Sequence, residues 1–473
     1  MTLEFVGLIA IAVAFMGMFS NPSFIVTAFL CATLLGSAAA FILESVGGLN
    51  ISPAHFLLLF VAIKLLGDRQ VVKNTLRGIE PGRPGFWLLL TVVYALVSAF
   101  FMPRVFSGLT SVFPVRILIN TVTVPLEPAM SNLTQSIYFI GDFVCFILLY
   151  GYAADPAGRR VLGNAALACV VLNLVFVVLD LATYWTGTSD LLAFIRNANY
   201  SLMSEAEMSG LKRIVGSFVE ASSFASATLG YFAYTFRLYL LGIRPRLTFT
   251  LSLLSLSALI LSTSTTGYVG VVVYLFICCV QILLLWGRKP LTPQMAAVLF
   301  GTPFAFLLVA VAVSLNDASS TYVRDLLDTM VFNKMQTDSG MERSAWNQQA
   351  IQNFFDTFGF GAGNGSLRAS SFPIAVLGSL GFVGTATFGL FLINILFGKP
   401  VNLRPGSFEA ANMQAAKSVC IAWLITASTS GALTDLGVPF FAFAAFASVQ
   451  PRSSAEETTR HGASGYASLV HGR

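Results

Sequence analysis

Two arginines and a run of glycines stand out in a polar segment of the chain, residues 316–371. The segment contains Glu342, Arg343 and Trp346, followed by Phe358-Gly-Phe-Gly-Ala-Gly-Asn-Gly-Ser-Leu-Arg-Ala-Ser-Ser-Phe372. Guanidinium groups bind phosphate oxygens two at a time, and closely spaced glycines let backbone N–H groups converge on an anion. Arg343, Arg368 and the glycines therefore indicate recognition of a phosphate-bearing substrate.

The glycine run also fits a second interpretation. Glycine adopts backbone angles that other residues avoid, so Gly361 and Gly363 suit a turn that leads back into an apolar segment. The run matches neither a Walker loop nor a dinucleotide fingerprint, because no strand is predicted before it and no Gly-Lys-Ser/Thr follows. An anion cradle and a simple turn both remain open from the sequence.

The rest of the chain has the composition of a membrane protein. Of its 473 residues, 56% are hydrophobic and 10% are charged, and the mean hydropathy is +0.78. Many of its apolar runs approach or exceed the ~20 residues that cross hydrocarbon. We predict an all-α, multi-pass integral membrane protein with about 12–13 transmembrane helices and a large late outer loop, residues 316–371. The apolar runs lie near 3–19, 23–42, 52–66, 86–101, 133–152, 161–184, 217–241, 247–262, 268–286, 295–315, 372–397, 415–429 and 433–449.

The domain organisation is simple. Residues 1–450 form one transmembrane domain, and residues 451–473 form a disordered cytoplasmic tail. The first run lacks a basic start and a small-residue cleavage site, so we expect it to be retained and not removed as a signal peptide.

The basic residues predict the orientation. One alternating set of connections carries 18 Lys and Arg residues and the other carries 9 over longer loops. The first set is then cytoplasmic, and the loops at 102–132, 185–216 and 316–371 face outward. Because orientation accounts for the net charge of +5, we predict no nucleic-acid partner.

A helix is expected after Ser344. Trp346, Ala350, Ile351, Phe354, Phe355 and Phe358 recur at helical spacing, so this helix should lie on the membrane or on the bundle. Arg343 falls within the apolar arc while Glu342 points away from it, and an arginine in that position needs a partner.

A second group of polar residues lies at the outer end of a predicted span. Glu220 is placed just inside the span, and Ser223, Ala227 and Gly230 extend its face as a small, polar stripe able to line a cavity. The alternative is a carboxylate that reaches back to the water interface. For Asp142 and Asp180 we favour structural hydrogen bonds.

Metal and triad chemistry are not indicated. The six cysteines all lie in apolar runs, and His461 and His471 lie in the tail. His55 is the one histidine beside a span, so no histidine cluster or Ser/His/Asp triad can form on the outer face. We predict no metal and no cofactor.

Three stretches are informative when read together. The first is Arg213-x-x-Gly216-x-Phe218-x-Glu220-x-Ser-Ser-Phe224, the second is Leu259-Ile-Leu-Ser262-Thr-Ser264-Thr-Thr-Gly267, and the third is Arg343-x-x-Trp346 with Phe358-Gly-Phe-Gly361-x-Gly363 and Ser370-Ser-Phe372. In this order, and with the predicted spans and late outer loop, they resemble the O-antigen polymerase and ligase superfamily of bacterial envelope proteins. The resemblance is strongest to its exopolysaccharide polymerases and covers residues from about 50 to 450.

The resemblance implies a metal-independent glycosyltransferase with a fold similar to the GT-C class in the bacterial inner membrane. Its donor and acceptor would both be saccharides linked to polyprenyl diphosphate, and membrane lipid, a flippase and a chain-length regulator would be its partners. Arg213 and Arg343 would bind the diphosphate. Glu220 would orient an arginine or accept the acceptor proton. Arg368, with Trp346 and the glycines, would position a substrate.

Two departures from the family bear on this assignment. The family commonly has an arginine where this chain has Thr265, and its ligases carry a late-loop histidine that has no equivalent here. The missing histidine counts against a ligase, which stays an alternative, and leaves the acceptor-activating group unidentified. A lipid-linked oligosaccharide flippase or transporter is the other alternative, but the chain shows no internal repeat and gathers its cations in one outer loop. A non-catalytic scaffold would leave Arg343 without a role.

Overall fold

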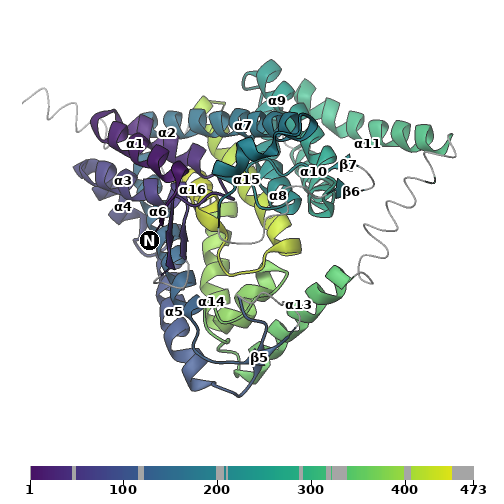
Figure 1. The fold of residues 1–473 in the computed structure, drawn as a ribbon. Helices are drawn as coiled ribbons and strands as arrows, with labels where there is room; N and C mark the ends of the chain where they lie inside the picture. Colours follow the sequence, from purple (N-terminus) through teal and green to yellow (C-terminus); the bar gives the residue numbers. More distant parts are fainter. Residues whose placement is uncertain are drawn as a thin grey trace, which may run out of the picture.

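The computed structural model describes residues 2–44, 49–115, 122–198, 207–208, 211–286, 291–315, 321, 338–398 and 406–449. These residues are mostly α-helical (Figure 1). Five helices are long and apolar enough to cross a membrane: α5 (Pro84–Val105), α6 (Met130–Ala153), α7 (Pro156–Trp185), α10 (Thr265–Trp286) and α14 (Phe372–Phe397). These five helices support a helical membrane protein. The larger number of about 12–13 transmembrane helices stays a prediction.

Further helices complete the bundle. Five of them are apolar: α1 (Phe5–Phe19), α2 (Pro22–Ala32), α3 (Pro53–Leu66), α9 (Pro245–Leu261) and α16 (Gly437–Ser448). The others are α4 (Arg69–Gly78), α8 (Ala221–Leu240), α11 (Pro293–Ser314), α13 (Asp338–Asp356) and α15 (Phe408–Ser430), with the 3-10 helix η2 (Ser189–Ile195). The tail 451–473 and most of residues 316–337 lie outside the described residues.

Small antiparallel sheets join the helices, which the prediction of an all-α fold did not include. One contains β1 (Thr2–Leu3), β2 (Phe41–Leu43) and β3 (Leu49–Ile51), and two hairpins pair β4 (Ser111–Val112) with β5 (Val124–Pro125) and β6 (Glu207–Met208) with β7 (Leu211–Lys212).

The predicted span 23–42 is wrong in its second half. Helix α2 ends at Ala32, and the chain turns into β2. Ser37 is fully buried in the turn, where its Oγ lies 2.9 Å from the carbonyl oxygen of Ser217 and 3.0 Å from that of Ile195. These long-range bonds satisfy polar groups that would otherwise be buried unpaired, so the turn is held in place although the sequence there is apolar.

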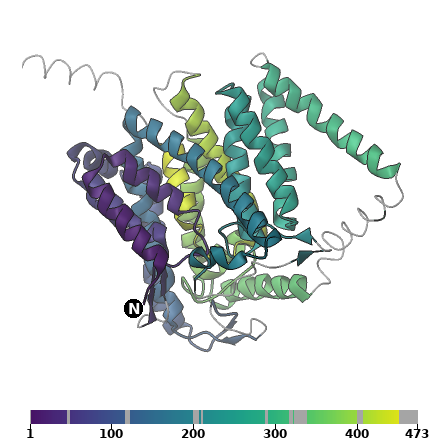
Figure 2. The ribbon, with the colours of Figure 1, turned by 45° about the horizontal axis from the view of Figure 1, so that its top comes forward.

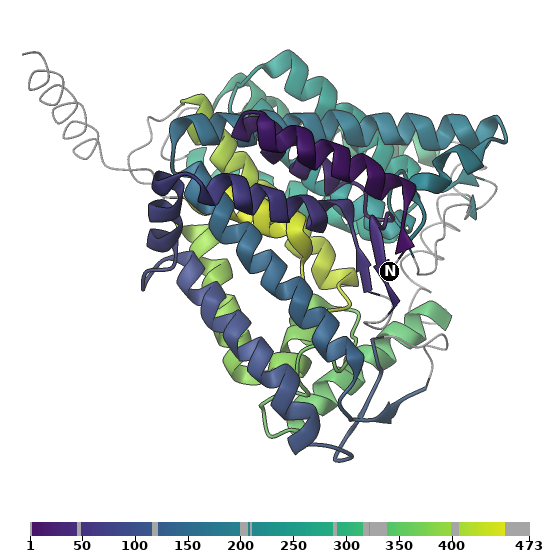
Figure 3. The same ribbon diagram turned by 60° about the vertical axis from the view of Figure 1, so that its left-hand side comes forward.

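The core lies where α6, α14 and α16 meet. Phe139 from α6 packs against Phe388 of α14 and Phe441 of α16, with ring centroids 5.9 and 6.3 Å away. Helix α8 packs between α9 and α15. Figure 3 shows α1, α3, α5 and α6 on the side of the bundle that carries the N-terminus.

Helix α13 confirms the helix predicted after Ser344, and it lies crosswise to α8, α9 and α10 (Figure 2). Its packed face contains Trp346 and Ala350, which are 8% and 1% exposed. Ile351 and Phe355, predicted on the same arc, are instead 38% and 65% exposed, and Phe358 after the helix is 77% exposed. An exposed apolar row beside a packed one suits a helix that rests on the bundle with one edge on lipid.

Candidate functional site

Helix α13 is fixed to the β4–β5 hairpin by buried hydrogen bonds. Asn353 donates from Nδ2 to Thr110 Oγ1 at 2.8 Å and to the carbonyl oxygen of Ser111 at 2.7 Å. The Thr110 hydroxyl in turn donates to Asp356 at 2.6 Å. Because Asn353 is fully buried, this contact holds the register of the helix and so the position of Arg343 on it.

The glycine run packs against a break in α14. Gly381 has φ +58° inside the helix, and the freed carbonyl oxygens of Gly378 and Ser379 accept from Ala362 and Gly363 at 2.8 and 2.9 Å. The N–H of Gly361 donates to Thr357 Oγ1 at 3.0 Å. The N–H groups of Gly361 and Gly363 are thus used within the protein, which gives these glycines a packing role and not that of an anion cradle.

Close backbone approach explains why these positions are glycine. Gly361 has φ +83°, and a Cβ atom there would lie 2.5 Å from the nitrogen of Gly381 and 2.6 Å from the oxygen of Ser379. Both the backbone angle and the space exclude a side chain.

Arg368 follows the glycines and stacks on Trp346, with its guanidinium carbon 4.0 Å from the ring centroid. Its backbone N–H donates to Phe113 at 2.9 Å. Burial lowers the pKa of the Arg368 guanidinium; nearby Glu342 and Glu220 oppose this shift, and Arg343 adds to it. Arginine remains cationic under such a shift, so the site holds a poorly solvated positive charge. The predicted residues Trp346, Arg343, Arg368 and Glu220 are therefore close together.

Arg343 lines a cavity of about 440 Å³, which we call the outer cavity. No ion pair of Arg343 is found among the described residues. Hydroxyl groups dominate the remaining polar lining: Thr265, Thr266, Ser344, Ser370, Ser371, Ser428 and Thr429. The second and third sequence stretches thus meet here.

Two helices begin at the outer cavity. Thr265 opens α10, and Ser371 is the N-cap of α14 with no side-chain capping bond. Helix N-termini carry partial positive charge and unpaired N–H groups, so they favour anions. Because Arg343 lines the same cavity, the outer cavity is suited to a phosphate group.

Glu220 lines a separate cavity of about 310 Å³, the inner cavity. Glu220 is the N-cap residue of α8, and its carboxylate accepts from the hydroxyl of Ser222. Asp435 also lines this cavity, together with aromatic rings and serines. Ser428 and Thr429 in the last turn of α15 border the outer cavity, and Ser430 borders the inner one.

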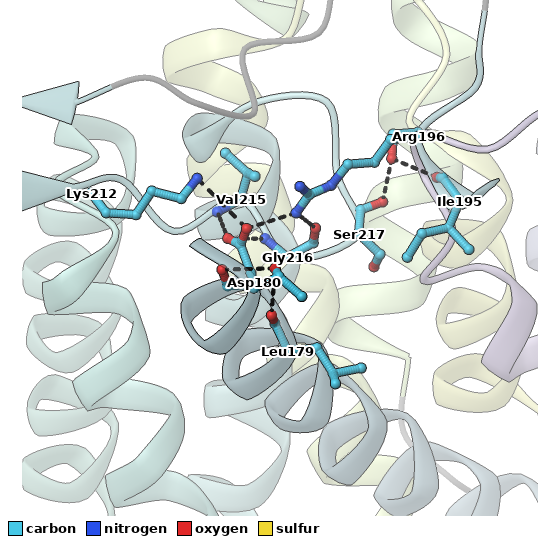
Figure 4. A network of polar contacts seen from close by, with 10 residues as sticks. Leu179, Asp180, Ile195, Arg196, Lys212, Val215, Gly216 and Ser217 are labelled. Atoms are coloured by element: carbon cyan, nitrogen blue, oxygen red, sulfur yellow. Dashed lines mark hydrogen bonds and ion pairs between the residues drawn. The ribbon is translucent and has the colours of Figure 1, made fainter. Parts of the chain in front are cut away.

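A buried ionic network around Asp180 holds the residues on either side of position 213 (Figure 4). Asp180, which is 1% exposed, pairs with Arg196 at 2.7 Å and Lys212 at 3.6 Å. It also accepts from the backbone N–H groups of Val215 and Gly216 at 2.9 and 3.0 Å. The predicted structural role of Asp180 is confirmed, since these bonds fix the segment that carries Arg213.

Arg213 itself is half-buried, and its Nε meets no hydrogen-bond partner among the described residues. The structure gives it no contact with Arg343 or Arg368 in this part of the chain. Arg213 lies near Glu220 only because the two residues are close in the sequence.

Sequence reasoning missed Asp435 and the hydroxyl-rich end of α15. The signal was the run Thr426-Ala-Ser-Thr-Ser-Gly-Ala-Leu-Thr-Asp435, which is unusually polar between two apolar runs. Asp142, expected to make structural hydrogen bonds, is fully buried, and neither carboxyl oxygen meets a donor among the described residues.

A scan against models of protein families and a search of curated proteins find no match to this chain. The resemblance to the polymerase and ligase superfamily therefore stays a prediction.

Proposed function

We propose that this protein is a polysaccharide polymerase of the bacterial inner membrane that joins repeat units linked to polyprenyl diphosphate at its outer face. The observation that carries the proposal is the outer cavity, which is lined by Arg343, by the N-termini of α10 and α14 and by many hydroxyl groups. A diphosphate is the anion that such a cavity fits when it opens from a helix bundle of membrane composition.

The proposed reaction is a metal-independent glycosyl transfer. A hydroxyl oxygen of the acceptor saccharide attacks the anomeric carbon of the donor, the bond from that carbon to the phosphate oxygen breaks, and polyprenyl diphosphate leaves. Negative charge builds up on the diphosphate as this bond breaks. Arg343 and the helix N-termini offset that charge, while Arg368, held on Trp346, adds a second cation nearby.

The test is a reaction with purified protein in detergent. The substrate is a polyprenyl-diphosphate-linked repeat unit, and chain length is measured by gel electrophoresis with and without EDTA. Growth of long polymer in both conditions supports the proposal. No polymer from protein that is folded by size-exclusion chromatography overturns it, and activity that EDTA removes and Mg²⁺ restores overturns its metal-independent part.

The same assay separates the alternatives. A ligase would transfer a preformed chain to a lipid A-core acceptor and would not lengthen chains without it. A flippase would make no new glycosidic bond in detergent, where the membrane has no two sides to equilibrate.

A further inference from the structure

The outer and inner cavities border on each other at two places. At the start of α14, Ser371 lines the outer cavity and Phe372 lines the inner one. In the last turn of α15, Thr429 lines the outer cavity and Ser430 the inner one. Since neighbouring Cα atoms lie about 3.8 Å apart, the two cavities are separated at both places by about the thickness of one residue.

This closeness restricts what the inner cavity can hold. In a saccharide linked to polyprenyl diphosphate, one oxygen atom joins the first sugar to the phosphate, so that sugar must lie directly beside the diphosphate. With the diphosphate in the outer cavity, the inner cavity is an adjacent space inside the bundle. Its volume of about 310 Å³ is at the lower end of the roughly 300–1,000 Å³ of small-molecule sites, which suits one or two sugar rings.

Aromatic rings and fixed hydroxyl groups form the walls of the inner cavity. Tyr231 and Trp423 both line it, and their rings meet edge to face with centroids 6.2 Å apart and planes at 81°. Ser226 lines it too, and its hydroxyl lies 2.6 Å from that of Thr426, which ties α8 to α15. Flat rings beside a few fixed polar groups suit a sugar ring with its hydroxyls.

The polar lining suits an uncharged sugar. The carboxyl oxygens of Glu220 and Asp435 accept hydrogen bonds from sugar hydroxyls with or without a proton on the group. The hydroxyl of Ser223 also lines the cavity and meets no hydrogen-bond partner among the described residues. No Lys, Arg or His among the described residues lines the inner cavity, so a carboxylate on the sugar would be buried without an ion-pair partner.

We propose that one donor molecule spans both cavities, with its diphosphate in the outer cavity and its first sugar, an uncharged one, in the inner cavity. This inference rests on the proposed polymerase function and names the part of the donor that the protein recognises. The outer cavity then binds any polyprenyl diphosphate, while the inner cavity selects the sugar that the diphosphate carries.

The experiment measures the binding of two probes to the purified protein in detergent. One probe is a polyprenyl-diphosphate-linked repeat unit whose first sugar is a neutral hexose, and the other is polyprenyl diphosphate without a sugar. The wild-type protein should bind the first probe about tenfold more tightly or better, because the ring stacking and hydrogen bonds of the sugar add to those of the diphosphate.

A substitution that fills the inner cavity should remove this difference. Ala227 is half-buried in the cavity wall, so Ala227→Leu should raise the Kd of the sugar-bearing probe to that of the sugar-free probe, whose Kd stays the same. Ala12→Leu, on the exposed face of α1, is the matched control and should change neither Kd. Ser223→Ala is a smaller change that decides if Ala227→Leu does not fold. It should weaken the sugar-bearing probe alone, by about fivefold, through the loss of one hydrogen bond.

Binding of one probe molecule per protein, weakened by Arg343→Ala as well, supports a single donor that spans both cavities. Two independent sites would place the sugar of another molecule in the inner cavity and overturn the inference. Equal affinity of the wild-type protein for the two probes, or an unchanged preference for the sugar in the folded variants, also overturns it. A first sugar that is a uronic acid and binds as tightly as the hexose would refute the restriction to uncharged sugars. A wild-type protein that distinguishes the two probes but makes no polymer refutes the proposed function instead.

Discussion

Replacing Arg343 with alanine tests the outer cavity most directly. Arg343 is half-buried at a cavity wall and has no ion pair among the described residues. Its removal therefore strands no buried carboxylate, and the thermal melting temperature should stay close to that of the native protein. An effect on activity would then report a contact with substrate and not a loss of fold.

The magnitude follows from the contact it would make. Two charge-assisted hydrogen bonds to phosphate, in a cavity partly open to water, contribute about 3 kcal/mol to the transition state. That corresponds to about a hundredfold in kcat/KM. Lysine keeps the charge but loses the planar two-point contact, so Arg343→Lys should recover about half of this free energy, or roughly tenfold in rate.

The assay measures the initial rate of polymer growth at several donor concentrations, with Arg104→Ala as the control. Arg104 is an exposed arginine at the end of α5 that stacks on Phe100, so its removal should leave the rate unchanged. A normal rate for Arg343→Ala would show that the outer cavity is not the diphosphate site. A large fall in melting temperature would refute the view that Arg343 is structurally dispensable.

Three further predictions concern topology and folding. A cysteine at Ala345 should react with a membrane-impermeant thiol reagent added to the periplasmic side while one at Arg246 does not, and the opposite pattern would reverse the predicted orientation. Gly361→Ala should lower the melting temperature well below that of Gly108→Ala. Both glycines have positive φ, but only at Gly361 do backbone atoms fill the space that a Cβ would take. Equal melting temperatures would contradict the packing of the glycine run against α14. Asp180→Ala should destabilise the fold by about 3–5 kcal/mol, because it leaves the cations of Arg196 and Lys212 buried without their carboxylate partner. Thermal melting measures this, with Asp190→Ala as the control. Near-native stability would show that the network does not hold this segment.

The helices could be predicted well because their signal is local. Most predicted apolar runs correspond to helices, and the periodicity after Ser344 found α13. What failed depends on contacts between distant residues. Nothing near Ser37 shows that it bonds to Ser217 and ends the predicted span. Nothing near Gly363 shows that its N–H donates to the carbonyl oxygen of Ser379. The exposed row at Phe355 was missed because an apolar residue can face either protein or lipid.

The site could be predicted only in part for a related reason. Arginines in an outer loop are conspicuous in an apolar chain, so Arg343 and Arg368 were found. Asp435 was not, because nothing near it in the sequence shows that it lines a cavity with Glu220, which lies more than two hundred residues earlier in the chain. The family resemblance suggested that Arg213 would join Arg343, yet the described contacts tie its segment to Asp180.

The arrangement of charge agrees with the proposed transfer, in which diphosphate leaves as an anion. The cation of Arg343 and the N-termini of α10 and α14 face the outer cavity, and the carboxyl groups of Glu220 and Asp435 face the inner one. Placing the last turn of α15 at the edge of both cavities keeps the two kinds of group near each other without pairing them. Since the helices and the anchored α13 hold these groups in place, the proposed reaction would need little reorganisation as negative charge builds up on the diphosphate.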